Sequence, residues 1–133
     1  MAPACQRVMA PPGLVVLLVE DDDDIRDLME AVLHDEGYSV CSAENGYRGL
    51  EVARARHPAL ILLDLMMPVM NGWEFRTHQR EDAELADIPV VVVSAAGQDS
   101  VVSLGAAAFL PKPFDVDSLV RAVREHAGYG PSA

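Results

Sequence analysis

The chain has 133 residues, of which 50% are hydrophobic and 23% are charged, and its formal net charge is −11. This composition is typical of one soluble globular domain, and no apolar stretch approaches the length that spans a membrane. Lys112 is the only lysine and the arginines are scattered, which argues against nucleic acid as a direct partner because binding to it requires clustered basic side chains.

Residues 1–13 are expected to form a disordered lead-in. They contain three prolines and one arginine but no continuous apolar block, so they do not resemble a signal peptide. The two cysteines, Cys5 and Cys41, have neither the spacing of a zinc site nor the number needed for a disulfide framework. Both observations favour a cytoplasmic protein.

From residue 14 onward, short apolar runs alternate with helix-like segments. In chain order, the runs predict strands over residues 14–19, 38–42, 60–63, 90–94 and 108–110. The segments that follow them predict helices over about residues 24–35, 46–55, 73–80, 99–104 and 116–127. Five such β–α units with short connections indicate an α/β fold: a doubly wound, five-stranded parallel sheet with helices on both faces.

The helices differ in how their apolar residues are spaced. The first has a clear apolar stripe, formed by Ile25, Leu28, Met29, Val32 and Leu33. The last is expected to turn an apolar face inward, formed by Val116, Leu119, Val120 and Val123. The third is short of apolar residues on its inner face because of His78 and Gln79, and the fourth has room for barely two turns before Gly105.

Polar side chains stand where these apolar runs end. Glu20 and Asp21 follow the first strand, Asp64 follows the third, Ser94 closes the fourth, and Lys112 comes after the fifth. The carboxyl ends of parallel strands meet at one edge of the sheet, which is where open α/β sheets bind their ligands. We therefore expect these side chains to share one crevice.

The acidic run of residues 20–24 has two interpretations. Its last three carboxylates are expected to lie in a solvated loop and to help cap the following helix. Glu20 and Asp21 continue directly from a buried strand and are expected to face Asp64. Two carboxylates 4 Å apart repel by about 4 kcal/mol at an effective dielectric constant of 20, so three together require a cation or a proton. With only oxygen ligands on offer, Mg²⁺ or Mn²⁺ is the natural ion.

Asp64 is the candidate nucleophile. Its carboxylate can attack a phosphoryl group in line and form an aspartyl phosphate, provided that charge on the equatorial oxygens is neutralised. The metal would supply one contact, the ammonium of Lys112 a second, and the hydroxyl of Ser94 a hydrogen bond. Lys112 stands between Pro111 and Pro113, which stiffen the segment. Taken singly, Ser94 would also fit an ordinary strand end and Lys112 a surface lysine.

Five stretches of the sequence together resemble the receiver domain of two-component response regulators, over about residues 14–127. They are Val19-Glu20-Asp21, residues 62–68, Asn71-Gly72, Val93-Ser94-Ala95, and residues 105–114 with Lys112-Pro113-Phe114. The resemblance implies a flavodoxin-like fold and phosphorylation of Asp64 by a histidine kinase or a small phosphodonor. It implies phosphate contacts from Ser94 and Lys112, and a cis Lys112–Pro113 bond. It also implies Mg²⁺ held by Glu20, Asp21, Asp64 and the main-chain carbonyl of Met66.

The resemblance further implies a conformational switch. In the family, a hydroxyl residue moves toward the phosphoryl group and an aromatic residue of the fifth strand turns inward with it. Ser94 and Phe109 stand at these places. Phe109 lacks the hydroxyl of the commoner tyrosine, so it would act by packing alone, and as a single residue it would equally fit the core.

Three features depart from the family pattern. The interval from Ser94 to Lys112 is about four residues shorter, close to one helical turn, so the fourth helix is expected to be shortened. In the family, the fourth helix, fifth strand and fifth helix commonly form the signalling face, so whether this chain forms a homodimer like its relatives is left open. Met66 and Ala96 stand where side chains flank the phosphoryl site, and neither can orient a water, which predicts slow hydrolysis of the aspartyl phosphate. We expect no effector domain after residue 127, and residues 128–133 are expected to be a flexible tail.

The expected output is a change in binding to another protein. The chain would be a stand-alone receiver, a relay intermediate that exchanges its phosphoryl group with a histidine phosphotransfer protein, or the receiver piece of a larger hybrid kinase or regulator. The alternative is an interaction module of the same fold that acts without phosphorylation.

We do not expect this chain to be an enzyme that acts on a separate substrate. It is expected to catalyse only its own phosphorylation and dephosphorylation. A haloacid-dehalogenase-like phosphatase would need a second acid where Met66 stands. A flavin site would need a phosphate-binding loop where the acidic run stands, and the carboxylates there would repel the phosphate.

Overall fold

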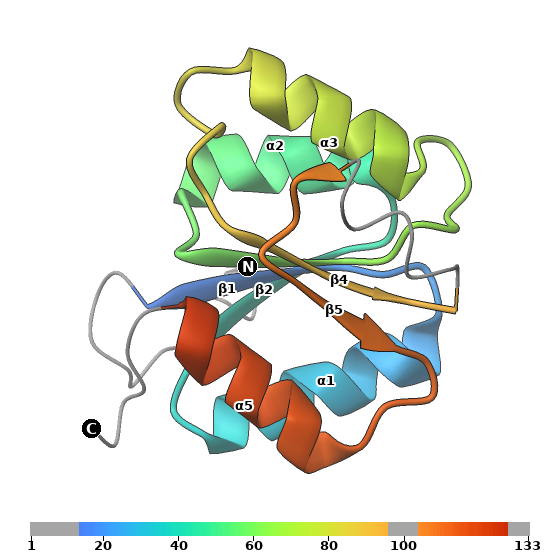
Figure 1. Cartoon of the computed structure of the whole chain (residues 1–133), viewed down its shortest axis with the longest axis vertical. Helices are drawn as coiled ribbons and strands as arrows, with labels where there is room; N and C mark the ends of the chain where they lie inside the picture. The colour runs from blue at the N-terminus through green and yellow to red at the C-terminus, as the bar shows by residue number, and fades with distance from the viewer. Residues whose placement is uncertain (1–13, 96–103, 128–133) are drawn as a thin grey trace, which may run out of the picture.

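The computed structural model describes residues 14–95 and 104–127 of the chain. In these residues, a five-stranded parallel sheet lies between two layers of helices (Figure 1). The strands are β1 (Val15–Val19), β2 (Ser39–Ala43), β3 (Leu60–Leu63), β4 (Val90–Ser94) and β5 (Ala108–Pro111). The helices are α1 (Asp23–Asp35), α2 (Gly46–Arg56), α3 (Gly72–Glu81) and α5 (Val116–His126).

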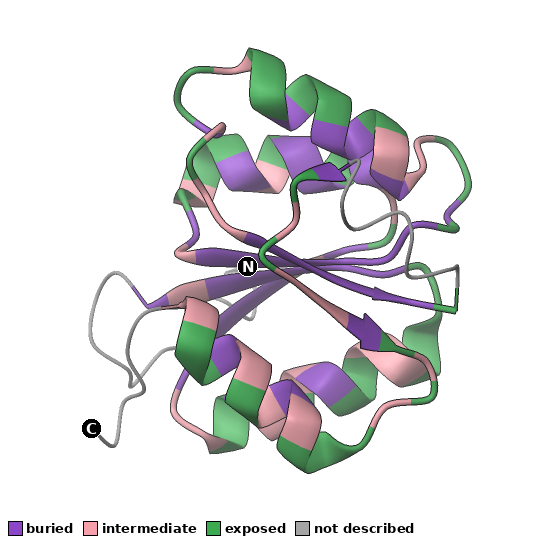
Figure 2. Cartoon of the chain, viewed as in Figure 1, coloured by how far each residue is buried: buried purple, intermediate pink, exposed green. Residues whose placement is uncertain are grey.

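The strand order is β2-β1-β3-β4-β5, and every neighbouring pair is parallel. Helices α2 and α3 cover one face of the sheet, and α1 and α5 cover the other (Figure 1). Successive residues of a strand point to opposite faces, so Leu17 packs in the core under α2 and α3 while Leu18 packs in the core under α1 and α5. Figure 2 shows the buried residues along the sheet and the inner sides of the helices. The prediction of a doubly wound sheet is confirmed.

The predicted strands and four of the predicted helices are found within two residues of their expected ends. Two residues of the predicted apolar faces are exposed: Leu28, from the stripe of the first helix, is 49% exposed, and Val116, expected to face inward, is 44% exposed. Each helix touches the sheet along a narrow row, and residues beside that row reach solvent. The buried positions of α1 and α5 are accordingly spaced four apart, at Met29, Leu33, Leu119 and Val123.

Three predictions fall on residues outside the described part of the chain. They are the disordered lead-in over residues 1–13, the flexible tail over residues 128–133, and the shortened fourth helix over residues 99–104, apart from its last position. That last residue, Leu104, is buried and packs in the core under α2 and α3.

Helix α3 buries polar side chains where the sequence lacks apolar ones. The guanidinium of Arg76 donates from Nε to the carbonyl of Leu104 (2.8 Å), from Nη1 to Oε1 of Gln79 (2.7 Å) and from Nη2 to the carbonyl of Gly105 (3.1 Å). The side-chain amide of Gln79 donates in turn to the carbonyls of Leu85 (2.9 Å) and Ile88 (3.0 Å). These bonds join α3 to the turn before β4 and to the segment before β5.

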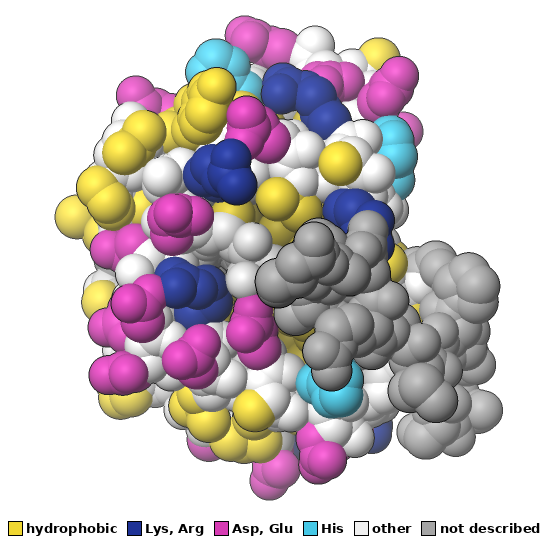
Figure 3. Space-filling view, turned by 180° about the vertical axis from the view of Figure 1, so that it is seen from behind, with side chains coloured by type: hydrophobic (Ala, Val, Ile, Leu, Met, Phe, Trp, Pro, Cys, Tyr) yellow, Lys and Arg dark blue, Asp and Glu magenta, His cyan; other side chains and the backbone are white. Residues whose placement is uncertain are grey.

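The surface reflects the acidic composition. On the face seen in Figure 3, Lys and Arg side chains are scattered among Asp and Glu side chains and do not gather into one patch. Among the helices of the described ranges, none combines the length and the apolar character needed to cross a bilayer.

Candidate functional site

The register of the strands brings the predicted polar residues to one edge of the sheet. Val19 of β1 pairs with Leu63 of β3, so Glu20 and Asp64 leave the sheet side by side, and the amide of Asp64 donates to the carbonyl of Val19 (2.9 Å). On the other side of β3, Ser94 at the end of β4 pairs with Pro111 of β5. The site is therefore assembled by strand pairing between segments far apart in the sequence.

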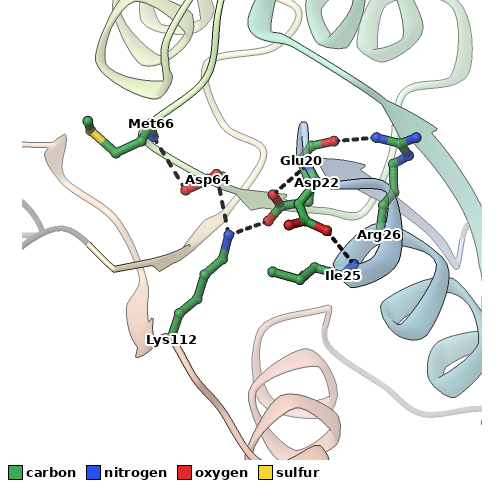
Figure 4. A network of polar contacts seen from close by, with 7 residues as sticks. All are labelled: Glu20, Asp22, Ile25, Arg26, Asp64, Met66 and Lys112. Carbon is green, nitrogen blue, oxygen red and sulfur yellow. Dashed lines mark hydrogen bonds and ion pairs between the residues drawn. The ribbon is translucent and has the colours of Figure 1, made fainter.

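Lys112 links the two buried acids of this edge. Its Nζ lies 2.7 Å from Oε1 of Glu20 and 3.4 Å from Oδ2 of Asp64 (Figure 4). Both carboxylates are buried, whereas the Lys112 side chain is 16% exposed. The backbone amide of Lys112 also donates to the carbonyl of Ser94 (3.1 Å), which holds the lysine segment against the end of β4.

Glu20, Asp21 and Asp64 form a group of carboxylates that could hold a metal ion. One oxygen from each lies within 4.8 Å of the others, and Asp21 is the exposed member. Lys112 balances only one of their three negative charges. A hard divalent cation fits the remaining charge and the all-oxygen donor set. The expectation that these carboxylates lie together is confirmed.

The buried charges shift the pKa values of Glu20 and Lys112. Burial raises the pKa of Glu20, and the charge of Asp64 adds to this, although hydrogen bonds from Lys112 and from the backbone amide of Asp22 act in the opposite direction. Burial alone would lower the pKa of Lys112, but its hydrogen bond to Glu20 and the charge of Asp64 outweigh burial and raise it. Lys112 therefore stays charged at neutral pH, and Glu20 binds protons more readily than an exposed glutamate.

The loop after β3 is shaped by close backbone contacts. The amide of Gly72 donates to the carbonyl of Leu65 (3.0 Å), and a Cβ at Gly72 would lie 2.5 Å from the carbonyl oxygen of Asp64. Only glycine fits there, which explains why the Asn71-Gly72 pair ends the loop between β3 and α3. The amide of Met66 faces Oδ1 of Asp64 (3.3 Å), while the Met66 side chain is 62% exposed.

Val69, in the same loop, has a strained backbone. Its φ angle is 68°, and a β-branched residue rarely adopts this left-handed conformation. The Val69 side chain is 81% exposed. The contacts of the loop therefore impose a conformation that the residue itself disfavours.

Lys112 sits in a segment with fixed backbone geometry. Pro111 ends β5, and the Lys112–Pro113 peptide bond is cis, as the resemblance implied.

Phe109 of β5 is half-buried and packs against the core under α2 and α3, opposite Val92 of β4. Ser94 is buried at the end of β4. Ala96, the second residue expected to flank the phosphoryl site, lies outside the described residues.

Two further residues of this region were not singled out from the sequence. Arg26, in the first turn of α1, reaches back to the main-chain oxygen of Glu20 (2.7 Å). Its position two residues after the acidic run, in the first turn of α1, was the signal available. Trp73 lines, together with Asp21 and Met66, a hollow of about 440 Å³ beside the carboxylates. No sequence pattern marked Trp73, because the hollow exists only once the loop and α3 are in place.

Comparisons with known proteins agree with this geometry. The family described as "Response regulator receiver domain" matches residues 16–124. The chain is 39% identical over 113 residues to the DNA-binding dual master transcriptional regulator RpaA of Synechocystis, covering 82% of this chain and 47% of RpaA. It is 32% identical over 112 residues to PilH of Pseudomonas aeruginosa, covering 81% of this chain and 93% of PilH. The chain spans about half the length of RpaA and of the Synechocystis response regulator Rre1.

Solved structures share the fold. The chemotaxis protein CheY4 of Vibrio cholerae superposes with a TM-score of 0.79 at 28% identity, covering 85% of this chain and 98% of that chain. The receiver domain of the sensor histidine kinase PA1611 of Pseudomonas aeruginosa superposes with a TM-score of 0.80 at 27% identity, covering 87% and 98%. That structure holds a magnesium ion in its active-site cleft. The chain described here belongs to the response regulator receiver domain family.

Proposed function

We propose that this chain is a phosphoacceptor of two-component signalling, phosphorylated on Asp64 by a histidine kinase or a histidine phosphotransfer protein. The observation that carries the proposal is the buried Asp64 carboxylate, with Lys112 at 3.4 Å and the carboxylates of Glu20 and Asp21 within 4.8 Å. A carboxylate in this setting has a cation on one side and a place for a second cation on the other. That is the electrostatic requirement for accepting a phosphoryl group.

The transfer step needs few protein groups. An oxygen of Asp64 attacks the phosphorus, the bond between phosphorus and the donor's imidazole nitrogen breaks, and the imidazole leaves with the electron pair. Mg²⁺, when bound, would neutralise charge on the phosphoryl oxygens, held by Glu20, Asp21, Asp64 and the main-chain carbonyl of Met66. Lys112 would exchange its contact with Asp64 for a phosphoryl oxygen while it keeps its bond to Glu20.

Ser94 and Phe109 would carry the response to the phosphoryl group. The Ser94 hydroxyl at the end of β4 would donate to a phosphoryl oxygen, and this would draw the segment after β4 toward Asp64. Phe109 of β5 would then repack against the core under α2 and α3. Its half-buried position in this structure supports such a packing switch.

The phosphorylated chain would act by changing its binding to another protein in the cytoplasm. It would work as a stand-alone receiver, as a relay intermediate, or as the receiver piece of a larger regulator or hybrid kinase. Its net charge of −11 disfavours nucleic acid as a direct partner. The only reactions it would catalyse are its own phosphorylation and dephosphorylation.

Intact-mass measurement after incubation with acetyl phosphate and Mg²⁺ tests the acceptor assignment. The wild-type chain should gain the mass of one phosphoryl group, and Asp64→Asn should gain none. Asp87→Asn is the matched control, since Asp87 is an exposed aspartate in the turn before β4, and this variant should be phosphorylated like the wild type. An adduct that persists in Asp64→Asn would contradict the assignment, and a wild type that accepts no phosphoryl group would favour the phosphorylation-independent module.

A binding experiment with beryllofluoride tests the signalling output. Beryllofluoride on Asp64 stands in for the phosphoryl group, so partners retained only by the treated chain would be the downstream proteins. Treated Asp64→Asn should retain none of them. An identical set of partners with and without beryllofluoride would argue against phosphorylation as the switch.

Met66 should slow the loss of the phosphoryl group. Its side chain is 62% exposed at the rim of the site and offers no hydrogen bond that could orient an attacking water. Met66→Asn should therefore shorten the lifetime of the aspartyl phosphate, measured by following the phosphorylated mass over time. An unchanged lifetime would show that Met66 does not limit hydrolysis.

A further inference from the structure

Arg26 makes contacts that the acceptor chemistry does not require. Its Nη1 donates to the main-chain oxygen of Glu20 at 2.7 Å, and its Nη2 pairs with the carboxylate of Asp23 (Figure 4 shows the first contact). The Arg26 side chain is only 17% exposed, although it belongs to the first turn of a surface helix. The guanidinium therefore folds back over the turn between β1 and α1.

The position of Arg26 is electrostatically unfavourable in two respects. A cation in the first turn of α1 opposes the positive end of the helix dipole. It also adds positive charge near the carboxylates that are proposed to hold Mg²⁺. A residue with these costs needs a compensating role, and its contacts indicate one.

Arg26 contacts residues that come before and after Asp21 in the sequence. Glu20 lies on one side of Asp21 and Asp23 on the other, and the guanidinium holds a group from each. The amide of Glu20 is already held by the carbonyl of Ala43 (3.0 Å). With Arg26 on its carbonyl, the Glu20 backbone is fixed on both sides, and the path of the chain through Asp21 is constrained.

We propose that Arg26 is a positioning residue for the metal site: it fixes the turn that directs Asp21 and Glu20 toward Asp64, and so raises the affinity for Mg²⁺. This inference rests on the proposed phosphoacceptor function. Residues that orient metal ligands typically contribute about 10-fold to 100-fold in affinity. The rival role, a counter-charge that offsets carboxylate repulsion, predicts the opposite effect on Mg²⁺, because removing a nearby cation would then strengthen binding.

The sign of the affinity change separates the two roles. Mg²⁺ titrations followed by the fluorescence of Trp73, the only tryptophan, report on the hollow that Trp73 shares with Asp21. Arg26→Met should raise the dissociation constant for Mg²⁺ about 10-fold. Arg26→Lys keeps the charge but cannot hold both partners at once, so its value should fall between those of wild type and Arg26→Met.

Arg48→Met is a matched control. Arg48 lies in the first turn of α2 and pairs with Glu51 three residues away. Arg48→Met removes one positive charge, as Arg26→Met does. Its Mg²⁺ affinity should equal that of the wild type. Its phosphorylation rate with acetyl phosphate at saturating Mg²⁺ should also equal the wild-type rate, because Arg48 touches none of the carboxylates of the site.

Several outcomes would overturn the inference. An unchanged or tighter affinity in Arg26→Met would assign Arg26 the counter-charge role alone. If circular dichroism shows that Arg26→Met does not fold, Arg26→Lys decides, and a wild-type affinity in that variant would overturn the proposal. A wild-type chain whose fluorescence and melting temperature do not respond to Mg²⁺ would overturn the proposed function and this inference with it.

Discussion

The edge of the sheet that carries Glu20, Asp64 and Lys112, here called the acceptor edge, and the inner face of α3 both bury polar side chains, but they balance charge in different ways. At the acceptor edge, three carboxylates share the single ammonium of Lys112. Under α3, the one buried guanidinium of Arg76 faces only neutral acceptors, two backbone carbonyls and the amide oxygen of Gln79. The first cluster keeps an excess of negative charge. The second is closed, since each nitrogen of the guanidinium has a partner.

This difference indicates what each cluster contributes. A closed network ties loops to a helix and stabilises one arrangement, because breaking it leaves buried carbonyls unpaired. An open network costs stability until a cation binds, and that cost makes the folded protein responsive to metal and phosphate. Burial also lowers the pKa of Arg76, with the nearby charge of Arg80 adding to the effect, yet an arginine stays charged at any physiological pH.

The largest change in the free energy of unfolding is expected when the hydrogen bonds of Arg76 are removed. Arg76→Met removes the donors to Leu104 and Gly105 and should lower the free energy of unfolding by about 3 kcal/mol, since each unpaired buried carbonyl costs about 1–3 kcal/mol. Urea denaturation measures the change. Arg48→Met, which removes an exposed arginine, should cost less than about 1 kcal/mol. Equal losses in the two variants would mean that the α3 network is not a stabilising element.

Binding of Mg²⁺ to the three carboxylates should raise the free energy of unfolding, by slightly less than Arg76→Met lowers it. Mg²⁺ at 100 times its dissociation constant should raise the free energy of unfolding by about 2.7 kcal/mol, measured by urea denaturation with and without the ion. Asp21→Asn should reduce this gain, and Arg76→Met should retain it in full. A loss of the Mg²⁺ effect in Arg76→Met would show that the two networks are coupled.

Relief of backbone strain should give a gain of about 1 kcal/mol. Val69→Gly removes the penalty of a β-branched residue at a φ of 68°, partly offset by the greater freedom of glycine in the unfolded chain. Thermal melting measures the gain. His57 has a φ of 47° at the end of α2, and because histidine tolerates this region better than valine, His57→Gly should gain less. A larger gain in His57→Gly would contradict the assignment of strain to the loop between β3 and α3.

The smallest effect should be a pH dependence of Glu20. The raised pKa of Glu20 means that the folded state prefers the protonated acid, so this group contributes stability at low pH and loses it as pH rises through the folded-state pKa. Metal-free Glu20→Gln should therefore melt above the wild type at pH 7, and the gap should shrink as pH falls toward 4. A gap that widens on acidification would reverse the sign assigned to Glu20.

The sequence alone determined the order of strands and helices and the residues at the strand ends. Short apolar runs separated by helical segments favour parallel strands, and parallel strands place Glu20, Asp64 and Lys112 at one edge whatever the details of the helices. These features follow from local patterns and from the fixed geometry of β–α units. The cis bond before Pro113 was implied by the family resemblance alone.

The tertiary structure decided which polar groups meet inside the molecule and which apolar groups remain outside. A buried arginine needs particular carbonyls, and neither the contact of Arg26 with Glu20 nor that of Arg76 with Leu104 can be read from periodicity. The exposure of Leu28 and Val116 likewise depends on how narrowly each helix touches the sheet. Periodicity records which side of an element is apolar, whereas hydrogen-bond partners distant in sequence become neighbours only when the whole chain is packed.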